Sequence, residues 1–424
     1  MQLSIQPTRT LQGEVTIPAS KSHTIRAVLL AALAPGTSTL ESPLFSDDTR
    51  AAIQACRSLG ATITQQGTTL IIEGFGSSPR QPSAALDMLN SGTSTNLIIG
   101  MLAALGISAE ITGDASLRSR PVAALARALT ELGCRIEFLD KPGCPPLRMS
   151  GRITGSAVAL DASKSSQYVS SLLLAAPLLA HDLAITVTNP SELPYIDLTL
   201  RWLDQQSIRY ERRGYSSFTV FGGQAYTPFD KAIPADWSSA AFPLCAAAVT
   251  DSRVLLRGLD TEDVQGDKAI VGYLRAMGAD ISIVSDGLLV KGTALRGREI
   301  DINATPDALP ALAVMGCYAR GTTRLHNVAQ ARVKETDRIA VMARELDKMG
   351  AAVEELPDGL VIRHSSLAGT HLHGHHDHRV VMALSLAGLM ARGTTVVDTA
   401  EAVSVTYPTY IESMQQLGAT INSF

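Results

Sequence analysis

The sequence predicts a two-domain α/β protein, and three observations lead to that class. The chain has 424 residues, close to three times the ~150 residues of a typical domain. A short motif recurs six times with a period of about 72 residues. Within each repeat, Ala- and Leu-rich stretches typical of helices alternate with strand-like runs of alternating polarity.

The repeated motif has the form Leu/Met-Gly-Ala/Cys-x-Ile/Val, and its glycine ends a helix just before a strand. The position is held by Gly60, Gly133, Ser207, Gly278, Gly350 and Gly418, with Ser207 in a degenerate copy. Glycine there supplies the positive φ that a helix C-terminus prefers. Turns at Gln66-Gly67 and Asp358-Gly359 predict hairpins. Each repeat is therefore predicted to be a compact β-α-β-α-β-β subdomain.

The six repeats are expected to form two groups of three. Pro18 and Pro234 are plausible points at which the chain crosses between the groups. The first domain would comprise residues 19–234, and the second would combine residues 1–18 with 235–424.

Composition excludes several classes of protein. Apolar residues make up 46% of the chain, charged residues 18% and aromatic residues 4%, so the core must consist of Ala, Leu, Ile and Val. The net charge of −4 argues against a nucleic-acid-binding protein with a broad basic face. We find no apolar run of membrane-spanning length and no signal peptide. The five scattered cysteines lack metal or redox spacing, so we expect a cytoplasmic protein.

Several predicted helix starts carry residues suited to binding anions. Ser20 or Ser22 can cap the helix that follows Pro18, and Lys21 and Arg26 add positive charge at the same end. In the segment Asn90-Ser-Gly-Thr, Gly92 would let the backbone approach a ligand closely. Each segment, taken alone, is equally consistent with an ordinary capped helix or turn.

A third start contains Ser165, Ser166 and Gln167, whose hydroxyls and amide suit a phosphate held by hydrogen bonds. Considered alone, this segment is better explained by an ordinary serine cap. The recurrence of such starts at equivalent points of different repeats, however, indicates that they converge on one cleft for a pair of doubly anionic substrates.

The most charged short stretch surrounds Lys334, Glu335 and Arg338. A helix here would place Lys334 and Arg338 four residues apart on one face, with Glu335 beside them. The two cations can neutralise a phosphate, and a carboxylate among them can transfer protons. The alternative is a solvated helical face with ion pairs.

Five histidines between His371 and His378 resemble a metal-binding tract, but no cysteine or patterned carboxylate accompanies them. We expect no metal site. His378 and Arg379 begin the next apolar helix, where Arg379 can bind an anion instead.

Taken in chain order, these motifs resemble the 5-enolpyruvylshikimate-3-phosphate synthase family, from residue 15 to about 410. The resemblance is carried by Lys21-Ser22-x-x-x-Arg26, Asn90-Ser-Gly92-Thr, Arg120-Pro121, Ser165-Ser166-Gln167, Pro194-Tyr195-Ile196, Asp236-x-Ser-Ser-Ala, Lys334-Glu335-Thr-x-Arg338 and Asp377-His378-Arg379. It implies a two-domain inside-out α/β barrel of three β-α-β-α-β-β units per domain, with the active site in the interdomain cleft. It also implies transfer of the enolpyruvyl group of phosphoenolpyruvate to the 5-hydroxyl of shikimate 3-phosphate, through a tetrahedral addition–elimination intermediate, in aromatic amino acid biosynthesis.

The resemblance assigns roles to individual residues. Shikimate 3-phosphate would be bound by Lys21, Ser22, Arg26, Ser165, Ser166, Gln167, Ser191, Tyr195, Asp307, Gln330 and Lys334. Phosphoenolpyruvate would be bound by Lys21, Gly92, Arg120, Gln167, Arg338, His378 and Arg379. The catalytic residues would be Asp307, which accepts the hydroxyl proton, Glu335, which moves the methylene proton, and Lys21. We expect a monomer that uses no cofactor or metal and binds neither nucleic acid nor membrane.

Electrostatics agree with this assignment. The two substrates together carry about six negative charges at neutral pH, because each has a carboxylate and a phosphate near −2. Six cations can offset them: Lys21, Arg26, Arg120, Lys334, Arg338 and Arg379. Addition of a hydroxyl to the enol carbon requires protonation of the methylene, hence an acid among the cations.

Four positions depart from the family pattern. Asn96 stands where Arg is usual, Gln330 where Asn is usual, and Val405 where many members have Lys. Glu192 stands where a phosphate-binding Ser is expected; a carboxylate there is unfavourable unless it points away, and the neighbouring Ser191 could substitute. These departures leave open a catalytically altered paralogue that binds anionic metabolites. They also leave open an enolpyruvyl transferase with a different acceptor.

One such acceptor is UDP-N-acetylglucosamine. The sister family that uses it usually carries a reactive cysteine before its Arg-Pro motif, where this chain has Ala115. That family also has Lys-Asn where this chain has Lys21-Ser22, so both features point away from it.

Overall fold

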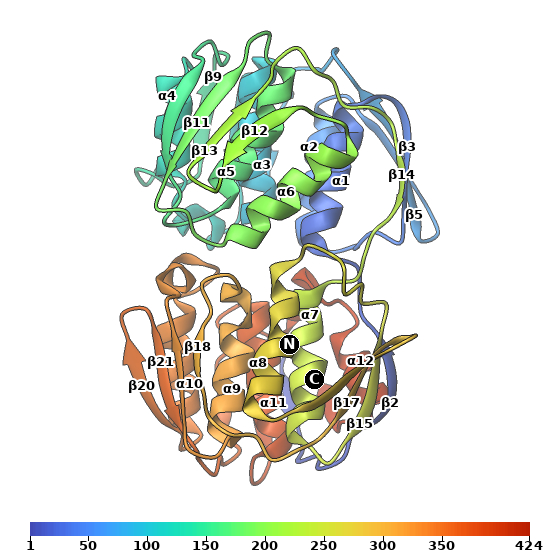
Figure 1. Ribbon diagram of the computed structural model, residues 1–424, viewed down its shortest axis with the longest axis vertical. Coiled ribbons are helices and arrows are strands. Elements are labelled where there is room, and N and C mark those ends of the chain that lie inside the picture. The colour runs from blue at the N-terminus through green and yellow to red at the C-terminus, as the bar shows by residue number, and fades with distance from the viewer. The chain divides into compact units, whose positions relative to one another are not determined.

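The computed structural model describes all 424 residues, which separate into two compact units (Figure 1). The N-terminal unit comprises Ala19–Ile233. The C-terminal unit comprises Met1–Pro18 together with Pro234–Phe424. The first residues of the chain thus fold with its second half.

Each unit contains three four-stranded sheets of one topology. In the N-terminal unit their spatial orders are β14 (Asp230–Ala232), β3 (Pro35–Glu41), β5 (Thr69–Phe75), β4 (Thr62–Gln66); β6 (Leu86–Asp87), β7 (Ala109–Thr112), β9 (Leu147–Ser150), β8 (Arg135–Phe138); and β10 (Ala157–Asp161), β11 (Leu183–Thr188), β13 (Ser217–Val220), β12 (Tyr210–Arg213). In the C-terminal unit they are β2 (Gln12–Thr16), β15 (Arg253–Arg257), β17 (Gly287–Lys291), β16 (Asp280–Val284); β18 (Glu299–Asp301), β19 (Thr322–His326), β21 (Gly359–Arg363), β20 (Ala352–Leu356); and β22 (His371–Leu372), β23 (Thr395–Val397), β1 (Leu3–Ile5), β24 (Ile421–Ser423).

The first two strands of every sheet are parallel, and the other pairs are antiparallel. A parallel pair needs a crossover, and the helix between its two strands provides it in four of the six sheets, as α3 does between β6 and β7. Segments distant in sequence complete three sheets: β14 pairs with β3, β2 with β15, and β1 lies between β23 and β24. The expected β-α-β-α-β-β unit is therefore confirmed.

Three helices in each unit are buried on nearly every side, as expected for helices that are apolar all round. They are α1 (Lys21–Leu33), α3 (Gly92–Leu105) and α5 (Gln167–Ala175) in the N-terminal unit, and α7 (Trp237–Val249), α9 (Leu309–Tyr318) and α11 (His378–Met390) in the C-terminal unit. Within each unit, Figure 1 shows helices inside and sheets outside. This is the inside-out arrangement that the sequence analysis expects.

Six further helices expose one face. They are α2 (Asp47–Ser58), α4 (Ala123–Glu131), α6 (Leu193–Gln205), α8 (Ile270–Met277), α10 (Arg338–Lys348) and α12 (Tyr410–Gln416). Short 3-10 turns complete the chain: η1 (Leu117–Ser119), η2 (Ala176–Leu178), η3 (Gly266–Ala269), η4 (Pro306–Ala308), η5 (Ala329–Val333) and η6 (Ala400–Val405). No helix has the length and apolar character needed to cross a membrane.

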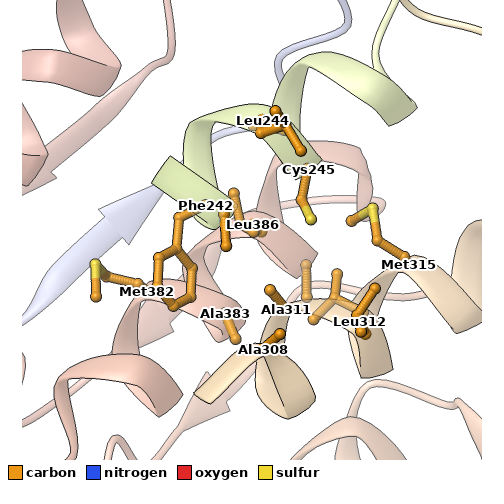
Figure 2. Packing of buried hydrophobic residues seen from close by; sticks show 14 of the residues in the cluster. Phe242, Leu244, Cys245, Ala308, Ala311, Leu312, Met315, Met382, Ala383 and Leu386 are labelled. Carbon is orange, nitrogen blue, oxygen red and sulfur yellow. The ribbon is translucent and has the colours of Figure 1, made fainter. Parts of the chain in front are cut away.

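Small side chains let the inner helices approach closely. Figure 2 shows this in the C-terminal unit, where Ala311 and Leu312 of α9 pack between Cys245 of α7 and Ala383 of α11. All four are essentially inaccessible to solvent. Aliphatic side chains, mainly Ala, Leu, Ile and Val, therefore make up most of the core, as the composition predicts, although aromatic residues such as Phe242 are also buried in it.

The repeat position has the same backbone conformation in all six copies. Its φ is positive throughout: 112° at Gly60, 108° at Gly133, 55° at Ser207, 106° at Gly278, 87° at Gly350 and 95° at Gly418. The left-handed helix end explains the glycine, and the degenerate copy keeps that geometry with serine. Hairpins join β4 to β5 and β20 to β21 at the predicted turns.

Candidate active site

The first candidate residues lie at the N-terminus of α1. Ser20, rather than Ser22, caps this helix, because its hydroxyl accepts the N–H of His23 at 3.4 Å. Lys21 is therefore the first helical residue. Its Nζ lies 2.9 Å from Oδ2 of Asp48 in α2, while Oδ1 of Asp48 is buried without a hydrogen-bond partner. A cation is thus held at a helix end that itself attracts anions.

Arg26, in the second turn of α1, is a buried cation whose hydrogen-bond partners are all neutral. Nε donates to Oγ1 of Thr199 at 3.0 Å and Nη1 to the carbonyl of Ser22 at 3.1 Å. Nη2 lies 3.5 Å from both Oγ of Ser170 and the carbonyl of Tyr195. Burial lowers the pKa of Arg26 to about 10, with a smaller opposing effect of Tyr195. A buried charge without an opposite charge is unfavourable, so this environment favours an anionic ligand.

A close approach of α3 and α5 brings Asn96 to Gln167. Any Cβ on Gly100 of α3 would collide with Ser171 of α5. One turn earlier on each helix, Nδ2 of Asn96 donates to Oε1 of Gln167 at 2.8 Å, and Nε2 of Gln167 donates to Oγ1 of Thr93 at 3.0 Å. Asn96 therefore orients Gln167 by a hydrogen bond, where the family pattern would place a positive charge.

Gly92 begins α3 directly against Arg120. The helix is capped by Ser91, whose hydroxyl accepts the N–H of Ser94 at 3.2 Å. A Cβ on Gly92 would lie 3.1 Å from Nη1 of Arg120, closer than most real contacts of a Cβ. Nη2 of Arg120 donates to Oδ1 of Asn90 at 2.6 Å. The absence of a side chain at Gly92 thus lets a guanidinium lie at the start of this helix.

Glu192 directly precedes α6, and its carboxylate reaches the N-terminus of α5. Its side chain is buried, its φ is 51°, and its Oε2 accepts the hydroxyl of Ser166 at 3.0 Å and the N–H of Ser166 at 3.4 Å. The hydroxyl of Ser165 accepts the N–H of Gln167, the first residue of α5, at 3.2 Å. The hydroxyl of Ser191 donates to a backbone carbonyl at 2.7 Å. The carboxylate of Glu192 is therefore directed at Ser166, an expected phosphate ligand, and does not point away from it.

In the C-terminal unit, Lys334 is not on the helix that the sequence analysis expects. Turn η5 ends before Lys334, and α10 begins only at Arg338. The cause is Asp337, whose carboxylate caps α10 by accepting the N–H of Ala340 at 3.0 Å. The prediction that Lys334 and Arg338 share a helical face is therefore wrong. Glu335 still reaches Arg338, with Oε2 2.6 Å from Nη2.

Arg338 lies at the centre of the charged side chains in the C-terminal unit. Its side chain is 1% exposed and contacts three carboxylates: Nε lies 2.8 Å from Oδ2 of Asp377, Nη1 2.7 Å from Oδ1 of Asp307, and Nη2 2.6 Å from Oε2 of Glu335. Burial acts to lower the pKa of Arg338, but Asp377, Glu335 and Asp307 together raise it well above its ordinary value. One guanidinium thus orients two of the proposed proton-transfer groups.

Asp307 lies between two arginines. Its second oxygen, Oδ2, is 2.9 Å from Nη2 of Arg379, which is also buried. Burial acts to raise the pKa of Asp307, but Arg379, Arg338 and Lys334 outweigh it and hold the pKa well below its ordinary value. An anionic ligand that competes for these arginines would make Asp307 a stronger base.

The remaining candidates of this unit surround the same elements. Asp377 caps α11 by accepting the N–H of Arg379 at 2.9 Å, and His378, the first helical residue, is buried. Gln330 lies in η5 and donates to a backbone carbonyl at 3.1 Å. Val405 is buried in η6 and brings no charge.

The six expected cations divide equally between the units. Lys21, Arg26 and Arg120 lie in the N-terminal unit, and Lys334, Arg338 and Arg379 in the C-terminal unit. Two carboxylates were missed by sequence reasoning, Asp48 beside Lys21 and Asp377 beside Arg338. No spacing links Asp48 to Lys21, but Asp377 stands in a motif already singled out and directly precedes a helix, which is a cap signal.

These features together define a class of protein. Buried arginines and helix N-termini suit small polyanionic ligands, while Asp307 and Glu335 on one guanidinium suit acid–base chemistry. The fold, the buried arginines and these two carboxylates are those of an acid–base enzyme that acts on small polyanionic substrates.

Comparison with known proteins specifies the family. Residues 5–414 match the family model of EPSP synthase (3-phosphoshikimate 1-carboxyvinyltransferase), and the chain belongs to this family. It is 47% identical to a 3-phosphoshikimate 1-carboxyvinyltransferase of Acetivibrio thermocellus, covering 97% of both chains. A counterpart from Methanothrix thermoacetophila is 44% identical, with 98% of both chains covered. The solved EPSP synthase of Acinetobacter baumannii superposes with a TM-score of 0.84 at 31% identity, covering 99% of both chains.

Proposed function

We propose that this chain transfers the enolpyruvyl group of phosphoenolpyruvate to the 5-hydroxyl of shikimate 3-phosphate and releases inorganic phosphate. Family membership over nearly the whole chain supports the reaction. The observation that carries it is the pair of carboxylates, Asp307 and Glu335, held 2.7 and 2.6 Å from one buried arginine, Arg338. That arrangement offers a proton acceptor and a proton donor in an environment made for anions.

Binding is assigned to the residues named above. Arg26, Ser22, Tyr195, Ser165, Ser166, Gln167, Ser191, Asp307, Gln330, Lys334 and Lys21 would hold shikimate 3-phosphate. Lys21, Gly92, Arg120, Gln167, Arg338, His378 and Arg379 would hold phosphoenolpyruvate. Arg26 supports this assignment, because its buried guanidinium has only neutral partners and gains most from a carboxylate or phosphate.

The proposed chemistry balances in two steps. In the addition, the 5-hydroxyl oxygen bonds to C2 of phosphoenolpyruvate, Asp307 takes the hydroxyl proton, and Glu335 gives a proton to C3. In the elimination, the C2–O bond to phosphate breaks, Glu335 takes a proton back from the new methyl group, and the proton held by Asp307 leaves with the phosphate. Lys21 and the arginines stabilise the negative charge of the departing phosphate.

The direct test is phosphate release with phosphoenolpyruvate and shikimate 3-phosphate together. Parallel reactions contain either substrate alone, or UDP-N-acetylglucosamine as the acceptor. We expect phosphate only with the shikimate 3-phosphate pair, and a product heavier than the acceptor by the enolpyruvyl group in mass spectra. The proposal would be refuted if phosphate were released with UDP-N-acetylglucosamine as the acceptor but not with shikimate 3-phosphate. It would also be refuted if folded protein released no phosphate with either acceptor.

We also propose that the enzyme acts as a cytoplasmic monomer. Large apolar side chains are exposed at Met1, Ile283, Val284 and Phe424, a small number for a chain of this size. Light scattering after size exclusion should give the mass of one chain, and twice that mass would contradict the proposal.

A further inference from the structure

The histidine-rich turn between β22 and α11 has no role in the proposed chemistry, yet it leads directly into Asp377. The structure contains no group of three or more His, Cys, Asp or Glu side chains arranged to hold a metal ion. The backbone of the turn is nevertheless constrained, because His375 and His376 adopt φ values of 54° and 53°. Such left-handed conformations of non-glycine residues persist only where surrounding contacts hold them.

Glu345, on α10, supplies the first of these contacts. Its side chain is fully buried, and its Oε2 accepts the N–H of His373 at 3.0 Å. Its Oε1 lies 3.1 Å from Nε2 of His375. Lys348 provides charge balance at 2.8 Å, and Arg344 lies near the same carboxylate. One carboxylate thus holds the turn through both its backbone and a side chain.

Residues after β23 hold the other side of the turn. Oδ1 of Asp398 lies 2.6 Å from Nδ1 of His373 and accepts the N–H of Gly374 at 2.9 Å. The hydroxyl of Thr399 accepts the N–H of His376 at 3.1 Å. Gly374 has no room for a side chain, because a Cβ would collide with the backbone of Asp398. The turn is therefore packed directly against its neighbours.

The turn is attached to α10 at two points. At its end, Asp377 binds Arg338 with both oxygens, at 2.8 Å to Nε and 3.2 Å to Nη2. At its start, His373 and His375 bind Glu345, seven residues or about two helical turns beyond Arg338. Because Asp377 also caps α11 by accepting the N–H of Arg379, the same turn leads into the position of Arg379.

We propose that Glu345 and His375 are positioning residues for Arg338 and Arg379, and that the histidine-rich turn thereby sets the affinity for phosphoenolpyruvate. The inference rests on the proposed function, in which these two arginines bind the donor. Neither Glu345 nor His375 is among the residues assigned to the substrates, so each would act through the orientation of Asp377.

A matched pair of variants tests the inference. His375→Asn and His376→Asn alter neighbouring residues in the same backbone conformation, which Asn tolerates. His375 contacts buried Glu345, whereas the side chain of His376 is 70% exposed. We expect His375→Asn to raise the KM for phosphoenolpyruvate about tenfold, the loss typical of a hydrogen bond to a charged group. The KM for shikimate 3-phosphate should rise clearly less, because Asp307 is one of its eleven expected ligands and contacts both arginines. His376→Asn should leave both KM values within twofold.

Glu345→Gln provides a second, independent variant. It preserves an oxygen for the N–H of His373 but removes the charge, and we expect the same selective rise in KM for phosphoenolpyruvate. General loosening of the fold would instead lower the active fraction, and so kcat, without favouring one substrate. If Glu345→Gln fails to fold, as judged by circular dichroism, the comparison of His375→Asn with His376→Asn still tests the positioning role.

The outcomes separate the two proposals. Wild-type protein that releases no phosphate from the substrate pair would contradict the proposed function. Active wild-type protein would overturn the positioning role if His375→Asn and His376→Asn behave alike. It would also do so if His375→Asn raises the KM values for the two substrates equally.

Discussion

Replacing Glu192 by Ser should tighten the binding of shikimate 3-phosphate. In the structure, the carboxylate of Glu192 accepts both the hydroxyl and the N–H of Ser166, at 3.0 and 3.4 Å. Ser166 is among the residues that the proposed function assigns to shikimate 3-phosphate, but while Glu192 holds its hydroxyl and N–H it should contribute little to binding of that substrate. Glu192 therefore acts as an internal anion that competes with the substrate for Ser166.

The magnitude follows from the geometry. A phosphate oxygen that accepts the same hydroxyl would lie about 5 Å from the carboxylate, where two unit charges repel by about 3 kcal/mol at an effective dielectric constant of about 20. A hydrogen bond from Ser166 to a charged phosphate contributes roughly 1.5–3 kcal/mol. Since about 1.4 kcal/mol corresponds to a factor of ten, and relaxation reduces the repulsion, we expect the Kd to fall by at least about tenfold.

The assay is a double-mutant cycle of Glu192→Ser and Ser166→Ala, with Kd measured by calorimetry and KM by phosphate release. In the wild-type background, Ser166→Ala should change either constant less than twofold, because Glu192 already occupies that hydroxyl. In the Glu192→Ser background, Ser166→Ala should weaken binding about tenfold. Glu192→Gln, which keeps the size of the side chain but not its charge, should fall between wild type and Glu192→Ser.

Two results would refute this reasoning. If Glu192→Ser weakens binding of shikimate 3-phosphate, Glu192 assists the substrate rather than competing with it. If Ser166→Ala weakens binding about tenfold in the wild type, Ser166 is already available to the phosphate. An unchanged KM for phosphoenolpyruvate in every variant serves as the control, since the change is confined to the acceptor side.

Three further predictions follow from other contacts. Glu335→Gln should lower kcat at least a hundredfold while leaving both Kd values within about threefold, because it removes the proton-transfer group but keeps its size; equal losses of binding and turnover would exclude the proton-transfer role. Gly92→Ala should raise the KM for phosphoenolpyruvate several-fold, because the new methyl group would lie 3.1 Å from Arg120. The control Gly272→Ala, at an open helical position, should leave that KM unchanged. Equal effects of the two variants in steady-state kinetics would contradict the steric argument. The environment of Glu345 lowers its pKa from 4.5 to about 2, because hydrogen bonds that favour the ionised form outweigh burial. The stabilising contribution of Glu345 is therefore present above pH 4.5 and lost as the pH falls toward 2. In urea unfolding, the difference in stability between wild type and Glu345→Gln should shrink over that range, and a constant difference would contradict the assignment.

Most of the fold could be predicted because the repeat motif encodes backbone geometry. A helix that ends in the left-handed region selects glycine, so five glycines at one spacing disclose the architecture, and even Ser207 keeps the conformation. The inner helices could be predicted equally well, because they are apolar on all sides. The structure adds the order of strands within each sheet. Strands β14 and β1 enter sheets from distant parts of the chain, and no local pattern specifies such pairing.

The candidate site was less predictable, because its contacts join residues far apart in sequence. The charge spacing around Lys334 predicts a helix, but Asp337 provides a competing cap signal and starts the helix only at Arg338. The orientation of Glu192 toward Ser166 depends on the packing of two helix starts, and sequence reasoning could identify only the unusual residue. Asp48 likewise has no signal in the sequence that ties it to Lys21.

The two buried arginines Arg26 and Arg338 illustrate opposite ways to prepare for a negatively charged substrate. Arg26 has only neutral partners and a lowered pKa, so an anion that reaches it has no carboxylate to displace. Arg338 is bound by three carboxylates and its pKa is raised, so an anion that reaches it must share the guanidinium with Asp307. Sharing weakens the hold of Arg338 and Arg379 on Asp307, whose pKa then rises toward that of an effective base. If Arg338 and Arg379 bind the donor, as the proposed function assigns them, the contacts that keep Asp307 a weak base without ligand would make its basicity rise when the donor binds.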